Sequence, residues 1–266
     1  MLPYPEIDPV ILQIGPLALR WYGLMYVLGF GATYFLVQRQ IRRHNLRDLA
    51  PLFENLNMVL LISLVLGGRL GYVLFYNFSY YLHHPLQIAN TLAGGMSFHG
   101  ALLGVLVGGI WFCRRHHMSF LKTADIYVAT IPVGLGLGRI GNFINGELYG
   151  RVTEMPWGMV FPGGGPLPRH PSQLYEAALE GVLLFILLHW MADFKRKKGW
   201  GHGSILAFFL VYYGILRSFA ELFREPDGHI GLLAGFMSRG QLLSIAMVGA
   251  GLLLLRSALK KPPQPA

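Results

Sequence analysis

Three arginines and one histidine interrupt long apolar stretches of this sequence: Arg69, Arg139, Arg217 and His99. The planar guanidinium group of arginine can bind two oxygens of a phosphate at once, and the imidazole of histidine exchanges protons near neutral pH. An arginine at the centre of a bilayer costs about 2.5 to 3.5 kcal/mol, so three unpaired ones would cost on the order of 8 to 10 kcal/mol. Structural ion pairs or snorkelling to the interface could offset this cost. Alternatively, the four side chains form a site that binds an anion and moves a proton.

The segment GLGLGRIGNFINGELYGR, residues 134–151, holds the densest group of such side chains. Arg139 and Asn142 are three residues apart and lie on one face if the helix continues that far. Asn145 and Glu147 then follow in the exit loop. A packing seam of small residues explains the glycines but leaves the arginine unexplained, so we expect a functional site here.

The segment YYGILRSFAELFREPD, residues 212–227, places Tyr213, Arg217, Glu221 and Arg224 at offsets of four, four and three. On a helix this spacing forms one polar stripe. The stripe can serve a ligand, or Arg217 and Glu221 can neutralise each other at i, i+4 without one. Both interpretations stay open.

The outer loop PGGGPLPRHPSQLYEAALEG, residues 162–181, leads into a predicted helix. Ser172 is the predicted N-cap, and Glu176 and Glu180 fall in the first turns, where capping and the helix dipole explain most of their presence. His170 and Glu176 could nevertheless reach the polar group. Asp125 is predicted at the start of another helix.

Other kinds of site have little support. Cys113 is the only cysteine, and fourteen helical residues would separate it from His99 by about 21 Å, so the two cannot form a nucleophile pair. The outer side has no histidine pair at helical spacing, and we predict neither a metal nor a cofactor. Nucleic-acid binding is also not expected, because the basic residues that give the net charge of +9 fall in short clusters between apolar stretches.

The composition requires a membrane. Of the 266 residues, 53% are hydrophobic and only 13% charged, which is too little polar surface for a water-soluble globule. A crossing needs about 20 mostly apolar residues. This criterion predicts an all-α polytopic protein with about seven transmembrane helices, in one domain over residues 1–266 with a short disordered cytoplasmic tail at about 259–266. The predicted spans are 19–38, 52–76, 95–113, 124–140, 173–193, 203–220 and 240–258.

The distribution of lysine and arginine predicts the orientation, because basic loops stay in the cytoplasm. Fourteen basic residues fall on one side: Arg39, Arg42, Arg43, Arg47, Arg114, Arg115, Lys122, Lys195, Arg196, Lys197, Lys198, Arg256, Lys260 and Lys261. Five fall on the other: Arg20, Arg151, Arg169, Arg224 and Arg239. The N-terminus should therefore face outward and the C-terminus inward.

This orientation brings the candidate residues to one depth. The second, fourth and sixth predicted helices run from inside to outside and carry Arg69, Arg139 and Arg217 in their outer portions, and His99 lies where the third helix enters from outside. Arg69 is accompanied by Tyr72 and Tyr76, and there a structural role is slightly favoured.

The strings HGALLG, GRIGNFINGELYGR and RHPSQLYE, with the pattern around residues 213–221, resemble the prolipoprotein diacylglyceryl transferase family. The similarity extends over nearly the whole chain and includes IDPVILQIGPLALRWYG and LGGRLGYVLFYN. It implies an enzyme of the bacterial inner membrane, with its active site toward the periplasm, that begins lipoprotein maturation. Such an enzyme moves a diacylglyceryl group from phosphatidylglycerol to the lipobox cysteine thiol of a prolipoprotein signal peptide and releases glycerol phosphate.

The resemblance also implies roles for particular residues. His99, Arg139 and Arg217 match catalytic positions, where a histidine suits the removal of the thiol proton and the arginines suit the leaving phosphate. Substrate-binding positions are expected at Tyr22, Arg69, Tyr76, Asn142, Asn145, Glu147, Gly150, Tyr213, Glu221 and Arg224. A transporter of an anionic lipid or metabolite remains the alternative, since intramembrane arginines would permit it equally, although no inverted repeat is visible.

Overall fold

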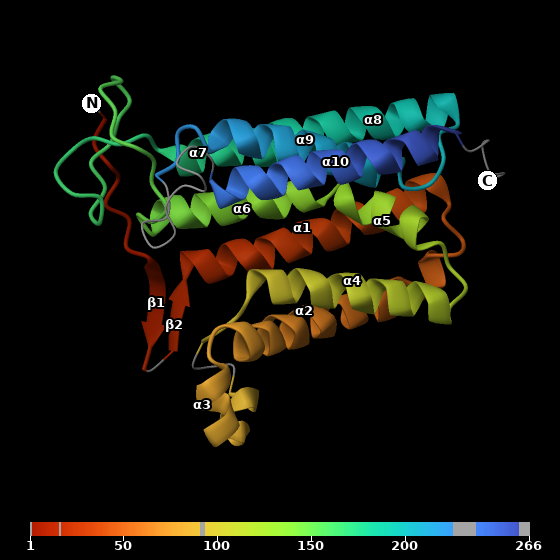
Figure 1. Ribbon diagram of the computed structural model, residues 1–266, viewed down its shortest axis with the longest axis horizontal. Helices are drawn as coiled ribbons and strands as arrows, with labels where there is room; N and C mark the ends of the chain where they lie inside the picture. The colour runs from red at the N-terminus through yellow and green to blue at the C-terminus, as the bar shows by residue number, and fades with distance from the viewer. Residues whose placement is uncertain (1, 16, 91–93, 226–237, 261–266) are drawn as a thin grey trace. The chain divides into compact units, whose positions relative to one another are not determined.

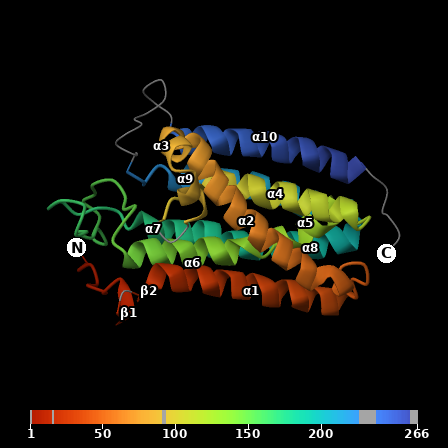
Figure 2. The ribbon, with the colours of Figure 1, turned by 90° about the horizontal axis from the view of Figure 1, so that it is seen from below.

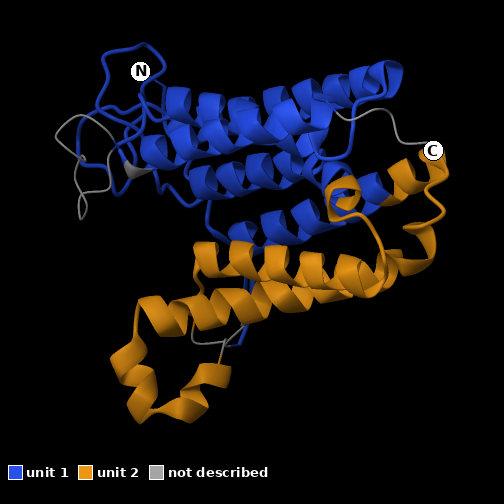
Figure 3. Ribbon diagram, turned by 45° about the vertical axis from the view of Figure 1, so that its right-hand side comes forward, with its two compact units in different colours: residues 1–37, 124–266 blue, residues 38–123 orange. Residues whose placement is uncertain are grey.

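The computed structural model describes residues 2–15, 17–90, 94–225 and 238–260. Most of these residues are helical. The chain divides into two compact units, the first made of Met1–Val37 and Ala124–Ala266 and the second of Gln38–Thr123 (Figure 3). The second unit is thus inserted in the sequence of the first, and the single domain over residues 1–266 stays a prediction.

The first unit is a helical bundle (Figure 1). Its helices are α1 (Trp21–His44), α5 (Phe120–Val128), α6 (Ile131–Ile144), α7 (Ser172–Glu176), the π-helical turn η3 (Ala177–Leu183), α8 (Leu184–Lys198), α9 (Ser204–Ala220) and α10 (Arg239–Lys260). Two of them are shared between the units: α1 belongs to the first unit as far as Val37, and α5 belongs to it from Ala124. α7, η3 and α8 join into one rod, Ser172–Lys198. α6 contacts η3, and α9 packs against both α8 and α10, so that α6, α8, α9 and α10 run alongside one another (Figure 2).

Several of these helices can cross a membrane. Among the described residues, Ala50–Phe75, Ser172–Lys198 and Gly240–Lys260 are each long and apolar enough, and α5 and α6 qualify together as a pair bent by 42°. Large apolar side chains such as Leu61, Ile186 and Leu253 are exposed on these helices, as expected for a surface in contact with lipid. The chain is therefore a mostly helical, multi-pass membrane protein.

Each predicted span overlaps helical structure, but several bounds differ. α1 continues to His44 instead of ending at residue 38, and the span predicted at 124–140 consists of α5 and α6, which are separated at Ala129–Thr130. Pro132 follows the break; it has no N–H to donate and suits only the first turn of a helix. α10 includes residues 259 and 260, and the rest of the predicted tail, 261–266, lies outside the described residues.

Asp125 does not start a helix as predicted, because it lies inside α5. Its carboxylate accepts hydrogen bonds of 2.8 Å from the backbone N–H groups of Gly203 and Leu206, and it forms an ion pair with Lys195. Asp125 thus satisfies N–H donors at the start of α9, a helix far away in the sequence.

The prediction of an all-α fold misses a two-stranded sheet. β1 (Val10–Ile14) pairs with β2 (Leu17–Arg20) in an antiparallel hairpin that turns at Gly15, whose φ is +58°. The register is irregular, since Val10 lies opposite Arg20 and Leu12 opposite Leu19. Such short strands carry no sustained alternation of polar and apolar residues, so the sequence gives little signal for them.

The second unit contains α2 (Phe53–Phe75), α3 (Phe78–His83), α4 (Phe98–Arg115) and two 3₁₀ turns, Ala50–Leu52 and Pro85–Ala89. α2 and α4 touch through glycines: a Cβ atom on Gly67 would lie 2.4 Å from the carbonyl oxygen of Gly100. Small residues are what allow membrane helices to approach this closely.

Candidate active site

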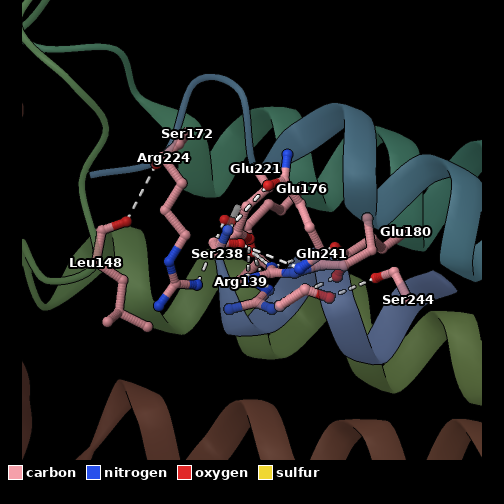
Figure 4. A network of polar contacts seen from close by, with 12 residues as sticks. Arg139, Leu148, Ser172, Glu176, Glu180, Glu221, Arg224, Ser238, Gln241 and Ser244 are labelled. Carbon is pink, nitrogen blue, oxygen red and sulfur yellow. Dashed lines mark hydrogen bonds and ion pairs between the residues drawn. The ribbon is translucent and has the colours of Figure 1, made fainter. Parts of the chain in front are cut away.

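Two of the predicted arginines meet around one carboxylate in the first unit (Figure 4). Oε2 of Glu176 lies 2.7 Å from Nε of Arg139 and also 2.7 Å from Nη1 of Arg217. The single oxygen therefore joins α6, which carries Arg139, to α9, which carries Arg217. Their common depth in the membrane stays a prediction.

Three further charged residues extend this contact into an ion cluster. Glu180 lies 3.5 Å from Nη2 of Arg139 and 3.4 Å from Nη1 of Arg217. Glu221 lies 2.7 Å from Nη2 of Arg217, but the pair is poorly aligned for a hydrogen bond. Arg224 lies 3.7 Å from Oε1 of Glu176. We call these six residues the ion cluster: Arg139, Glu176, Glu180, Arg217, Glu221 and Arg224.

The cluster is electrically balanced but unevenly exposed. Its three arginines and three glutamates sum to zero formal charge. The side chains of Glu176 and Glu180 are 1% and 0% exposed, whereas those of Arg139 and Arg217 are 18% and 12% exposed. The arginine side chains therefore keep some exposed surface, whereas the two central carboxylates are fully enclosed.

The helical rod places its two glutamates through an irregular turn. Glu176 ends α7 and Glu180 lies in η3, a π-helical turn of the kind that often occurs at functional sites. Gly181 in the same turn touches α6, because a Cβ atom there would lie 2.8 Å from the Cα of Gly136. This close approach brings Arg139, one turn further along α6, within reach of both carboxylates.

The stripe predicted on the sixth span is only partly helical. α9 ends at Ala220, with Glu221 as its C-cap, so Arg224 lies beyond the helix. The i, i+4 pair between Arg217 and Glu221 does form. Arg217 also contacts Glu176 and Glu180, so the pair is part of a larger network of charges, and a role of the stripe in ligand binding stays a prediction.

The exit loop of α6 is held by amide groups. α6 ends at Ile144 with Asn145 as its C-cap, four residues beyond the predicted end of this span at 140. Asn142, which is buried, donates to Oε1 of Glu147 at 2.8 Å, and Asn145 donates to the same oxygen at 3.2 Å. Gln173 donates to the backbone carbonyl of Glu147 at 2.6 Å, which ties the loop to α7.

Gly150 lies where the exit loop meets the chain after α9. It pairs with Arg224 in an antiparallel β-bridge, and its N–H donates to the carbonyl of His170 at 2.8 Å. A Cβ atom on Gly150 would lie 2.4 Å from the carbonyl oxygen of Phe223 and 2.7 Å from the Cβ of His170. No larger residue fits without moving the backbone, which accounts for the glycine at this predicted position.

Two predicted site residues of the first unit are tyrosines, one packed against α6 and the other carried by α9. Tyr22 on α1 packs on Gly141 of α6, and its hydroxyl lies 3.0 Å from that of Tyr26. Tyr213 stands four residues before Arg217 on α9, and its ring stacks on Phe209.

The remaining predicted residues belong to the second unit. His99 is exposed in the first turn of α4, with its ring edge-on to Phe98. Arg69 is 5% exposed and donates hydrogen bonds of 2.7 to 3.1 Å to the carbonyls of Gln87, Ile88, Gly94 and Gly95. It thus organises a loop of its own unit. Tyr76 is exposed at the C-cap of α2 and stacks on Tyr72.

The outer loop contains a titratable group with a shifted pKa. Burial lowers the pKa of His170 below its ordinary value of 6.5, which favours the neutral ring. Nδ1 of His170 lies 3.1 Å from the hydroxyl of Tyr175, which also accepts a hydrogen bond of 2.7 Å from Trp157. Within the described residues, no group of three or more histidine, cysteine, aspartate or glutamate side chains is arranged to hold a metal ion.

Comparison with known proteins decides the family. The family model described as prolipoprotein diacylglyceryl transferase matches residues 9–256. The chain belongs to this family. It is 58% identical to the phosphatidylglycerol–prolipoprotein diacylglyceryl transferase of Desulfotalea psychrophila over 252 residues, covering 94% of this chain and 93% of that protein. It is 54% identical to the protein of the same name from Geobacter sulfurreducens, covering 94% of each chain. A third protein of that name, from Vibrio vulnificus, is 48% identical and covers 98% of this chain and 94% of its own.

Membership of a transferase family makes this chain an enzyme. Two of its glutamates have a more central position in the candidate site than the sequence predicts. Glu176 was expected at most at the edge of the site, and Glu180 was expected only to cap a helix, yet both lie at the centre of the ion cluster. The sequence does contain an indication that these two glutamates are important. Two carboxylates inside a largely apolar helix are as costly as the arginines that drew attention first.

Proposed function

We propose that this enzyme transfers the diacylglyceryl group of phosphatidylglycerol to the thiol of the lipobox cysteine of prolipoproteins, the first step of bacterial lipoprotein maturation. The observation that carries the proposal is that Arg139 and Arg217, on two membrane helices, contact the same carboxylate and have partly exposed side chains. The names of its relatives supply the substrates. Intramembrane arginines alone would also suit a transporter, but membership of a transferase family favours group transfer.

In this reaction a sulfur–carbon bond forms and a carbon–oxygen bond breaks. The thiolate of the peptide attacks the glyceryl carbon that carries the phosphate, and glycerol phosphate leaves with the bonding electron pair. Negative charge grows on the leaving phosphate as the bond breaks. Donors already fixed in place at that point lower the barrier most effectively.

Arg139 and Arg217 are proposed to hold this phosphate. Their guanidinium groups are fixed by neighbouring carboxylates, and their side chains keep part of their surface exposed. His99 is proposed to take the thiol proton, because a neutral imidazole can accept a proton and only the thiolate is an effective nucleophile. The proposal for His99 rests on its chemistry and on its position at the start of α4.

The other predicted residues are proposed to bind or orient the substrates. Near the arginine pair these are Asn142, Asn145, Glu147, Gly150, Tyr213, Glu221 and Arg224, with Tyr22 on α1. Tyr76 and Arg69 are proposed with them from the second unit. For Arg69 the role would be indirect, because its donors are engaged by backbone carbonyls.

The proposed setting is the bacterial inner membrane, with seven crossings, the N-terminus outside, the C-terminus inside and the active site toward the periplasm. The crossings would be α1, α2, α4, the pair α5 and α6, the rod Ser172–Lys198, α9 and α10. The uneven distribution of basic residues supports this direction. Labelling of single cysteines in a variant that lacks Cys113, from either side of sealed vesicles, tests it.

The decisive experiment combines purified protein, phosphatidylglycerol and a synthetic lipobox peptide. We expect the peptide to gain the mass of one diacylglyceryl unit while glycerol phosphate is released, and we expect His99→Ala and Arg139→Ala to abolish both. Absence of release by the wild type would overturn the proposal. Uptake of an anionic lipid into sealed vesicles without chemical change would favour transport instead.

A further inference from the structure

We propose that Glu176 is a positioning residue for the transfer reaction, holding Arg139 and Arg217 together as one phosphate-binding pair, and that Glu180 is a weaker second brace. The inference rests on the proposed function. The rod Ser172–Lys198 would thus fix the geometry of two arginine side chains that belong to other helices, α6 and α9.

The contacts show how two guanidinium groups are held next to each other. Both are positively charged and would repel without a shared counter-ion. Nε of Arg139 and Nη1 of Arg217 each lie 2.7 Å from the same oxygen of Glu176, which is the length of a charge-assisted hydrogen bond. Glu180 also contacts both arginines: its Oε2 lies 3.5 Å from Nη2 of Arg139, and its Oε1 lies 3.4 Å from Nη1 of Arg217. The shorter distances mark Glu176 as the stronger link.

This arrangement leaves donors for a ligand. Arg139 uses Nε for Glu176 and Nη2 for Glu180, and in the described part of the chain its Nη1 group makes no hydrogen bond or ion pair. The side chain is 18% exposed although both of its carboxylate partners are closed off. One edge of the guanidinium group is thus fixed by carboxylates, and Nη1 is left as the donor proposed for the phosphate.

Stability alone does not explain two carboxylates at this place. Apolar residues in place of a buried ion pair are often neutral or stabilising. Nor do the carboxylates increase anion affinity, because they cancel the positive charge that would attract a phosphate. Their benefit is fixed geometry, since a displacement of about 1 Å at a reacting centre can cost on the order of 100-fold in rate.

These opposite effects on rate and affinity give a specific test in the variant Glu176→Gln. The change raises the formal charge of the ion cluster from zero to +1 and removes the shared counter-ion. We expect kcat for transfer to a lipobox peptide to fall about 100-fold, while KM for phosphatidylglycerol in mixed micelles stays the same or decreases. A purely structural role would lower the melting temperature and the yield of folded protein but leave kcat per folded molecule unchanged.

Asp193→Asn serves as the matched control, because it removes a carboxylate from the same rod, where Asp193 is exposed and, among the described residues, forms its ion pair with Arg196 of its own helix. We expect its kcat and KM to match those of the wild type. In Glu180→Gln the expected fall in kcat is smaller, about tenfold, because the distances to both arginines are longer.

The outcomes separate the two proposals. A wild type without transfer activity rejects the proposed function itself. An active wild type with a folded Glu176→Gln variant of unchanged kcat rejects the positioning role, and so does a rise in KM at constant kcat. If Glu176→Gln does not fold, Glu180→Gln decides: a lower kcat without a higher KM supports the brace, and an unchanged kcat rejects it.

Discussion

The side-chain amide of Asn142 donates a hydrogen bond of 2.8 Å to the carboxylate of Glu147. Asn142 is only 6% exposed and belongs to the last turn of α6, whereas Glu147 is exposed in the loop that follows. The bond therefore connects a buried helical position to an accessible carboxylate. It fixes the direction in which Glu147 leaves the bundle, one turn and a loop away from Arg139.

Asn142→Asp tests this connection. The new carboxylate would face Glu147 with like charge and could no longer donate, so we expect the exit loop to shift and transfer activity to fall about 10- to 100-fold. The free energy of unfolding should drop by about 1 to 3 kcal/mol, as for other lost buried hydrogen bonds. Rates measured with the lipobox peptide and melting in detergent give the two values. Asn77→Asp, at an exposed position of the second unit, is the control; wild-type kinetics in Asn142→Asp would contradict the role.

A variant of Arg69 distinguishes a structural role from a direct contact with the substrate. If its function is to hold the loop through Gln87, Ile88 and Gly94, then Arg69→Ala leaves their carbonyls without the donors that now bind them. We expect a loss of about 2 to 4 kcal/mol in stability and faster hydrogen exchange or proteolysis around residues 85–95. A direct substrate contact would give another pattern, namely an unchanged melting temperature and exchange rate with a raised KM for phosphatidylglycerol.

The part of the site that lies in continuous sequence could be predicted. Arg139, Asn142 and Glu147 are close in the chain, and helical spacing together with the cost of charge in lipid was enough to select them. Arg217 and Glu221 were found by the same spacing rule, and their pair is confirmed.

What the sequence did not predict depends on contacts between distant segments. Glu176 looks like a residue of a first helical turn until α6 and α9 are placed beside it. The bridge between Gly150 and Arg224 joins positions 74 residues apart, and nothing in local spacing ends α9 at Ala220. Asp125 shows the same limit, because the helix that it caps begins 79 residues later. Local patterns identify which side chains are costly, and the tertiary fold decides which partners offset that cost.

The pH dependence of stability should include a contribution from His170. Because burial lowers its pKa below 6.5, the unfolded chain binds a proton at this residue more readily than the folded chain does. The stabilising contribution is therefore complete above about pH 6.5 and is lost as the pH falls below that value toward the folded pKa. We expect the melting temperature of the wild type to fall more between about pH 7.5 and 5.5 than that of His170→Gln. Parallel curves for the two proteins would contradict this contribution.

The start of α9 provides a prediction about stability that does not involve catalysis. Asp125 is 6% exposed and satisfies the N–H groups of Gly203 and Leu206 while pairing with Lys195. Asp125→Asn removes the charge, weakens the cap and leaves the lysine without its counter-ion, which should cost about 3 to 5 kcal/mol. Adding Lys195→Met removes the unpaired charge, so the double variant should regain part of that loss.

Activity separates this structural role from the catalytic one. Arg217 follows Gly203, the N-cap of α9, by fourteen positions, a rise of about 21 Å, so the cap is remote from the arginine pair along the helix. The kcat per folded molecule of Asp125→Asn should therefore equal that of the wild type at a temperature below the melting transition of both. Unfolding in detergent and transfer kinetics, measured on the same preparation, give both quantities. A large fall in kcat at wild-type stability would mean that the start of α9 communicates with Arg217, and that the capping role alone is an incomplete account of Asp125.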